Sequence, residues 1–351
     1  MGRYTQQRTF QARFQRPAKP AAEAAPELST YSPHTDLAIE AHEMAGGKSG
    51  IPGVDIEHED IESGIHVSRV HVRNAQGEKR IGKRKGNYIT LEVPGLRQKD
   101  PDLQEQVAAQ FARELTNLLK IPEDATVLVV GLGNVHVTPD ALGPLVVERL
   151  FVTRHLFRYM PDVLEDGCRP VAAVSPGVLG ITGIETSEIV QGIADRVKPD
   201  LVIAIDALAA RSLNRVNATI QIADTGIEPG SGVGNKRRAL DESTLGVPVF
   251  SIGVPTVVDA ATIANDAIEL VLQQLRDKVP DNGATLIFDQ FAFEEKWQMI
   301  KEVLDPVGNN LMVTPKEIDE FVEDIAHIVA KGLNVALHPG LTMDDADMLT
   351  H

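Results

Sequence analysis

The sequence predicts an α/β fold, in which a mostly parallel, mixed sheet carries helices on both faces. Short runs of Val, Ile, Leu and Ala alternate with longer segments of helical periodicity from about residue 126 to residue 275. Aromatic residues make up only 4% of the 351 residues, so aliphatic side chains must build the core. A core of that kind suits parallel strands that are covered on both faces.

Two strands are expected before the alternating part. Residues 65–72 alternate apolar and polar side chains as a half-buried strand does, and residues 88–93 look like a second strand. Residues 102–119 then show the apolar spacing of a helix. We expect the two strands to form a small additional β element near residues 64–95, at a mixed or antiparallel edge of the sheet.

Strands and helices alternate in the rest of the chain. The predicted strands cover residues 126–130, 171–174, 201–205, 218–222 and 249–252. The predicted helices cover residues 141–154, 186–197, 260–275, 293–304 and about 314–330. In the last of these, Thr314 is expected at the N-cap, Pro315 at the first helical position and Glu317 as the capping-box carboxylate. Residues 276–295 are expected to be a variable region, and residues 341–351 a polar tail.

The charge and the cysteine content restrict the partners and the compartment. A formal net charge of −16 argues against direct nucleic-acid binding, which needs clustered Lys and Arg, so we expect protein partners. The single cysteine, Cys168, excludes a disulfide within the chain and fits a reducing cytoplasm. We expect no membrane contact, because no apolar run is long enough to span a bilayer and residues 1–33 lack the apolar core of a signal peptide.

The first 33 residues differ from the rest of the chain. They carry five Lys or Arg residues, two acidic residues and four prolines, which indicates a disordered basic arm. An Arg-rich start with few acids also resembles an organelle transit peptide.

Two aspartates are the candidates for chemistry. Function in an open α/β sheet collects at the carboxyl ends of the strands. Asp206 ends the apolar run 201–205, and Asp140 follows the strand 126–130 through a loop. In one cleft, two such carboxylates could act as general acid and general base. The alternatives are that Asp140 merely caps a helix that begins at Ala141, and that Asp206 is a buried acid held by backbone amides.

Cofactor motifs are incomplete. The string GLGNVH at residues 131–136 has His136 where a dinucleotide fingerprint needs its third glycine. The string GGKSG at residues 46–50 has a histidine where a P-loop needs its first glycine. No HExxH string or Cys/His spacing supports zinc. We therefore predict that the protein uses no cofactor.

Several long strings carry a resemblance to a known family. They are GLGN with VTPDALGP (within 131–144), RHLF (154–157), PGVLGITGIETSEI (176–189), IAIDALAARSLNRVNATIQIADTGIEPGSGVGNKR (203–237), GVPTVVDA (253–260) and NLMVTPKEID (310–319). Over about residues 31–337 the chain resembles the germination protease of spore-forming bacteria. The arm before this region looks longer than is usual for the family, and the region 276–295 looks shorter.

The resemblance implies an atypical aspartic endopeptidase that cleaves small acid-soluble spore proteins during germination. The family's two important aspartates carry over to Asp140 and Asp206. The implied fold is similar to that of hydrogenase-maturation endopeptidases. Those enzymes use a metal-binding histidine for which no counterpart is found here, so we predict no required metal.

The resemblance also implies a precursor that removes its own N-terminus. The matching site is HTDLAIE at residues 34–40, with the cut between Asp36 and Leu37. Residues 1–36 would then be a prosegment and residues 37–340 a single protease domain, which disfavours the transit peptide. A homotetramer in the cytoplasm of the forespore or spore core is implied as well. Two alternatives are a catalytically inactive module that binds small spore proteins and a metal-dependent peptidase that matures a hydrogenase.

Overall fold

The structure of the protein is a computed structural model, which describes residues 35–46, 50–164, 166–229, 238–278, 293–304 and 311–349. The expected basic arm before residue 35 lies outside the described residues, as do residues 279–292 of the expected variable region.

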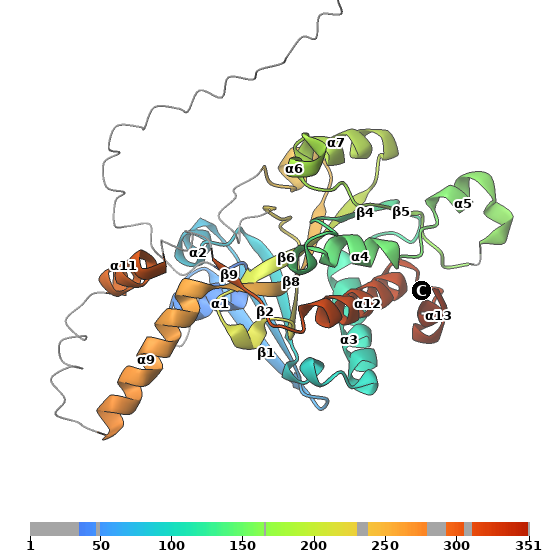
Figure 1. Ribbon diagram of the computed structural model, residues 1–351. Helices are drawn as coiled ribbons and strands as arrows, with labels where there is room; N and C mark the ends of the chain where they lie inside the picture. Colours follow the sequence, from blue (N-terminus) through green and yellow to red (C-terminus); the bar gives the residue numbers. More distant parts are fainter. Residues whose placement is uncertain are drawn as a thin grey trace, which may run out of the picture.

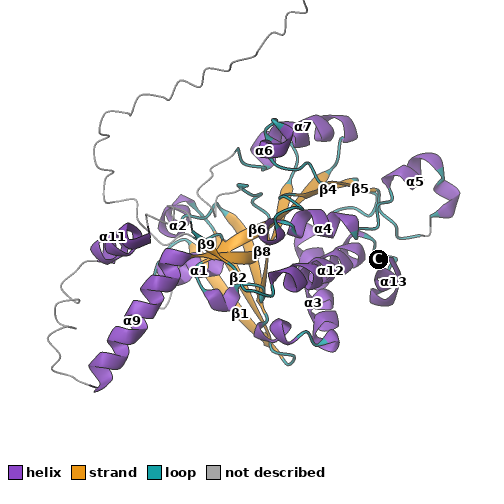
Figure 2. Cartoon of the chain, viewed as in Figure 1, coloured by secondary structure: helices purple, strands orange, loops and turns teal. Residues whose placement is uncertain are grey.

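One sheet runs through the described part of the chain (Figures 1 and 2). Its order is β1-β2-β3-β7-β8-β6-β4-β5, and the short β9 pairs with the far end of β8. The strands are β1 (Val54–Ile61), β2 (Ile65–Val72), β3 (Gly86–Glu92), β4 (Val127–Gly131), β5 (Val171–Val174), β6 (Leu201–Ala210), β7 (Thr219–Ala223), β8 (Val249–Asp259) and β9 (Met312–Val313). This confirms the predicted α/β class with a mixed sheet between helices.

The sheet has two halves. In the first, β5, β4, β6 and β8 are parallel to their neighbours. In the second, β1, β2, β3 and β7 pair in antiparallel fashion, and β7 joins this half to β8. The parallel half follows from its continuous apolar runs, because strands that are covered on both faces need no polar positions.

Helices cover both faces of the sheet. They are α1 (Ala38–Met44), α2 (Ala75–Ile81), α3 (Pro101–Leu119), α4 (Leu142–Glu148), α5 (Arg154–Tyr159), α6 (Leu179–Thr182), α7 (Thr186–Val197), α8 (Glu242–Leu245), α9 (Ala260–Lys278), α11 (Phe293–Leu304), α12 (Ile318–Leu337) and α13 (Met343–Leu349). Short 3₁₀ turns are η3 (Pro94–Gln98), η4 (Thr138–Asp140), η5 (Pro161–Val163) and η6 (Leu213–Arg215). None of the described helices combines the length and the apolar character that a membrane crossing needs.

The two faces of β6 pack against different helices. Ile203 and Ile205 belong to the large core that also contains the apolar faces of α3, α4 and α12. Val202 and Ala204 point the other way and pack with α7. Further along that second face, Leu208 packs in the cluster formed with α1. Because successive side chains of a strand alternate between its faces, Asp206 points to this same face. It lies between the residues of β6 that pack with α7 and the residue that packs with α1.

Several predicted boundaries are wrong, because tertiary contacts extend or shorten an element. Strand β6 continues past Asp206, and β8 continues beyond its predicted end at residue 252, because the two strands pair along this stretch. The helix expected over 141–154 ends at Glu148. Elements β1 and α2 were not predicted, and α13 occupies the expected tail.

The predicted start of the last helix is also wrong. Helix α12 begins at Ile318, and its N-cap residue, Glu317, makes no side-chain capping bond. The Thr314 hydroxyl instead donates to the Thr256 carbonyl oxygen at 2.8 Å, which ties the chain to the end of β8. The helix then extends to Leu337, beyond the expected end, because its apolar face stays buried along that length.

Candidate active site

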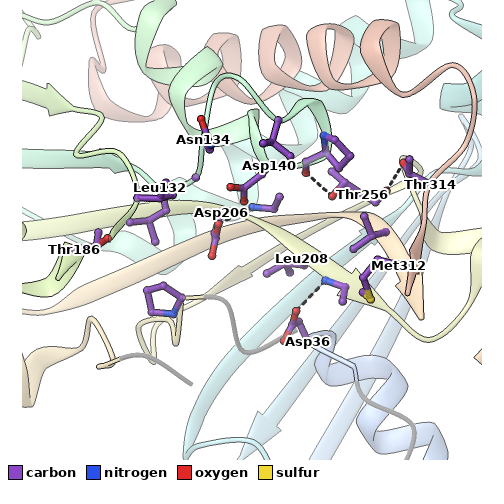
Figure 3. A pocket seen from close by; sticks show the side chains of 18 of the residues that line it. Asp36, Leu132, Asn134, Asp140, Thr186, Asp206, Leu208, Thr256, Met312 and Thr314 are labelled. Carbon is purple, nitrogen blue, oxygen red and sulfur yellow. Dashed lines mark hydrogen bonds between the residues drawn. The ribbon is translucent and has the colours of Figure 1, made fainter. Parts of the chain in front are cut away.

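A cavity of about 540 Å³ opens beside the carboxyl ends of β4 and β5 and along the second half of β6 (Figure 3). The residues that line it are Asp36, Leu132, Gly133, Asn134, Val137, Pro139, Asp140, Gly177, Val178, Gly180, Thr186, Asp206, Ala207, Leu208, Ala209, Glu228, Pro229, Thr256, Val257, Met312 and Thr314. The cavity forms where neither α7 nor α1 covers the sheet. It therefore contains both aspartates that the sequence selected, together with Asp36.

Asp206 lies inside β6, where its backbone is opposite Gly253 of β8. The residue is 7% exposed, and one of its carboxylate oxygens accepts a hydrogen bond from the amide of Ala207 at 3.0 Å. A backbone amide thus offsets part of the cost of removing a carboxylate from water. The expectation that Asp206 ends its strand is wrong. The residue nevertheless lines the cavity, because it lies between the stretch of β6 that packs with α7 and the stretch that packs with α1.

Asp140 is the last residue of η4, which precedes α4. Its amide donates to the Val137 carbonyl at 2.7 Å, and its own carbonyl accepts from the amide of Asn134 at 3.0 Å. These backbone bonds fold the β4–α4 connection back on itself and fix the position of Asp140. Ala141 is the N-cap residue of α4, so the alternative that Asp140 merely caps this helix does not hold.

Gly133 makes this tight loop possible. Its φ is +111°, a value that favours glycine, and a Cβ atom at this position would lie 2.0 Å from the carbonyl oxygen of Asp140. The GLGN string at residues 131–134 therefore serves the close approach of two loop segments, and it carries the acid into the cavity.

Two threonines that the sequence analysis did not single out as site residues support the Asp140 loop. The Thr256 hydroxyl donates to the carbonyl oxygen of Pro139 at 2.7 Å, and the Thr314 hydroxyl donates to the carbonyl of Thr256. Both residues line the cavity. Thr256 lies in the string GVPTVVDA and Thr314 in the string NLMVTPKEID, both of which carry the family resemblance. That resemblance was the sequence signal that could have selected them as site residues.

Asp140 and Asp206 come together through the parallel pairing of β4 with β6. Gly131 at the end of β4 is in register with Ile205, so the loop after β4 begins beside Asp206. Figure 3 shows both carboxylates directed into the cavity. Two carboxylates that line one cavity are the groups that general acid–base chemistry needs, one to take up a proton and one to donate it.

Asp36 lines the same cavity, and the residue after it, Leu37, is buried beneath the surface. The Asp36 amide donates to the Ala209 carbonyl at 3.0 Å, and the Ala209 amide donates to the Asp36 carboxylate at 2.8 Å (Figure 3). Asp36 lines the cavity, whereas the side chain of Leu37 is completely buried. The peptide bond that the sequence indicates as a cleavage site is therefore attached to the edge of the pocket that contains Asp140 and Asp206.

Within the described residues, no group of three or more His, Cys, Asp or Glu side chains is arranged to hold a metal ion.

The fold and the cavity are those of an α/β enzyme, and comparisons with known proteins place it among the peptidases. A family model described as "Germination protease" matches residues 34–286 and 282–350. The chain is 48% identical to a germination protease of Bacillus cereus (strain ATCC 10987 / NRS 248) over 93% of this chain and 99% of that protein. It is 47% identical, with the same coverage, to germination proteases of Bacillus thuringiensis subsp. konkukian (strain 97-27) and Bacillus anthracis (strain CDC 684 / NRRL 3495). The chain belongs to the germination protease family, as the sequence strings predicted.

Proposed function

We propose that this protein is an aspartic endopeptidase that begins the degradation of small acid-soluble spore proteins during germination. The observation that carries the proposal is that the carboxylates of Asp140 and Asp206 line one cavity. The family supports a protease that acts in germination. The kind of substrate rests on the resemblance of the sequence strings to the family.

In the proposed reaction the two carboxylates share the proton transfers. One takes a proton from a water molecule, whose oxygen forms a bond to the carbonyl carbon of the scissile peptide. The other donates its proton to the leaving nitrogen as the carbon–nitrogen bond breaks. The products are one carboxylate and one amine, and a proton exchange between the two aspartates restores the starting state.

We also propose that the chain is made as a precursor, which cuts itself between Asp36 and Leu37 and loses residues 1–36. The position of Asp36 supports this idea, because it lines the same cavity as Asp140 and Asp206, so no second molecule is needed to bring the bond to that cavity. The resemblance further supports a homotetramer in the spore core. Light scattering on the purified protein would measure the number of subunits.

Substitution of each aspartate tests the function. We expect Asp140→Asn and Asp206→Asn each to slow the shortening of the full-length chain, and the cleavage of an added small acid-soluble spore protein, by at least about 100-fold, since an amide cannot exchange a proton. Asp102→Asn is the control, because Asp102 is an exposed residue in the first turn of α3. Mass spectrometry of the fragments measures both reactions.

Three outcomes would contradict the proposal. Normal cleavage by both asparagine variants would exclude the aspartate mechanism. Binding of the small spore protein without fragments would indicate an inactive binding module. Loss of cleavage in the presence of a chelator, with recovery when a metal is added back, would favour a metal-dependent peptidase.

A further inference from the structure

Two side chains hold the peptide bond between Asp36 and Leu37 from its carbonyl side. The Lys83 ammonium donates to the carbonyl oxygen of Asp36 at 2.9 Å and to that of Thr35 at 3.0 Å. The Gln221 side chain donates its NH₂ to the same Asp36 oxygen at 3.3 Å, while its own oxygen accepts from the Ala38 amide at 2.7 Å. Gln221 thus spans the bond, and the Asp36 carbonyl oxygen has two donors.

The position of Lys83 is unusual for a lysine. Lysine normally lays its stem on apolar surface and extends its ammonium into water. Lys83 lies in the segment between α2 and β3, and its ammonium turns toward the backbone carbonyls of Thr35 and Asp36. Burial lowers the pKa of Lys83, whereas the charges of Asp36, Glu40 and Glu228 raise it. Placing a cation where burial disfavours its charge is costly, so the contact with the two carbonyls calls for an explanation.

The residues that follow the bond are also held by buried contacts. Leu37 is completely buried in the apolar cluster that includes Val70 and Leu208. The buried carboxylate of Glu40 accepts hydrogen bonds from the amides of Arg211 at 2.7 Å and Ser212 at 2.9 Å. The segment from Asp36 to Glu40 therefore packs against the rest of the domain through the kinds of contact that a bound peptide makes.

We propose that Lys83 and Gln221 position the Asp36–Leu37 bond for self-cleavage by holding the carbonyl oxygen of Asp36. This inference rests on the self-cleavage proposed above. When water adds to the carbonyl carbon, the electron pair of the C=O bond moves onto that oxygen. It returns when the bond to the Leu37 nitrogen breaks and that nitrogen takes a proton from the carboxylate pair. An ammonium and an amide already directed at the oxygen stabilise this transient negative charge.

Substitutions of the two donors in the full-length chain, with a control that removes the same charge as Lys83→Met, test the inference. We expect Lys83→Met to slow the appearance of the chain that begins at Leu37 by about 100-fold, the usual effect of removing such a donor. Gln221→Glu should have an effect of similar size, because it keeps the acceptor for Ala38 and replaces the donor with a negative charge. The control, Lys85→Met, removes the same charge from an exposed neighbour and should cleave like the wild type.

A conservative variant separates positioning from a merely structural role. Lys83→Arg keeps a cationic donor and should retain self-cleavage to within about tenfold, while Lys83→Met should keep the thermal midpoint of the wild type because its side chain fills similar space. The wild-type rate should fall as pH rises through the lowered pKa of Lys83, whereas the Lys83→Arg rate should not, since arginine stays charged.

Equal or faster self-cleavage of Lys83→Met would overturn the inference, and a faster rate would mean that the contact holds the bond away from reaction. An equal loss of the thermal midpoint in Lys83→Met and Lys83→Arg would assign Lys83 to stability alone. If the wild-type chain does not shorten at Asp36–Leu37 at all, the proposed precursor itself fails, which is a different result.

Discussion

Some buried titratable side chains in this protein are held by specific backbone partners, and His338 is an example outside the cavity. It is completely buried at the end of α12. Its Nδ1 accepts from the amide of Arg169 at 3.1 Å, and its Nε2 lies 3.1 Å from the carbonyl oxygen of Phe151, to which it donates. These partners require the neutral ring. Burial lowers the pKa of His338 to about 4, and the nearby Arg169 charge adds to this despite the favourable contact with the Phe151 carbonyl.

The lowered pKa of His338 predicts a loss of stability in mild acid. Between about pH 6.5 and pH 4 the unfolded chain binds a proton at this residue and the folded chain does not, so the free energy of unfolding falls as pH falls. From pH 7.5 to pH 5 this residue should contribute a loss of about 2 kcal/mol. Urea unfolding at both pH values measures this change in the free energy of unfolding. His338→Gln should be less stable at pH 7.5 but lose less on acidification, whereas the exposed-site variant His71→Gln should keep the wild-type slope. An unchanged slope in His338→Gln would contradict this assignment.

At the scale of elements, the β4–α4 connection decides where Asp140 lies. Gly133→Ala would force a Cβ atom to within 2.0 Å of the Asp140 carbonyl oxygen and would strain a backbone with φ of +111°. We expect peptidase activity to fall by about 100-fold, because a shift of about 1 Å in a reacting group costs that much. Gly180→Ala is a matched control. Gly180 lines the same cavity, and a Cβ atom there meets nothing within 4 Å.

Activity and the urea midpoint should be measured for both glycine variants. Comparable losses of activity in Gly133→Ala and Gly180→Ala would mean that crowding of the cavity matters, and not the Asp140 loop. Full activity of Gly133→Ala would show that the loop adapts without moving its aspartate.

The elements also show what a sequence can and cannot predict. The parallel strands were predictable because runs such as Val127 to Val130 have no polar position, and that pattern is local. The continuation of β6 beyond Asp206 was not, since it depends on pairing with β8, which lies far along the chain. Thr314 satisfies a local capping pattern, yet its hydroxyl binds a carbonyl of β8. Asp140 and Asp206 could be selected because each acid follows an apolar run in the sequence, but Lys83 and Gln221 could not, because nothing local indicates that they meet the bond after Asp36.

Across the whole molecule, strands of the parallel half of the sheet line the cavity, and Asp36 at that cavity is held in part from the antiparallel half. The parallel half supplies Asp140 and Asp206. The antiparallel half supplies Gln221 on β7, and Lys83 lies just before β3. Each half alone would offer either the carboxylate pair or the contacts to the Asp36 carbonyl. Self-cleavage as proposed therefore needs the complete domain.

This arrangement predicts that self-cleavage is intramolecular. Asp36 is bound to Ala209, Lys83 and Gln221 of the same chain, so the reaction should be first order, with a half-time that stays constant over a tenfold dilution. Asp206→Asn full-length chain, added as a target to wild-type chain, should shorten at least about tenfold more slowly than the wild type does, because its own segment occupies the contacts and must leave them to reach another molecule. Mass spectrometry distinguishes the two chains if one is isotopically labelled. A rate that rises in proportion to concentration, or equal shortening of the two chains, would mean that molecules cut one another and that the contacts around Asp36 do not present the bond for cleavage.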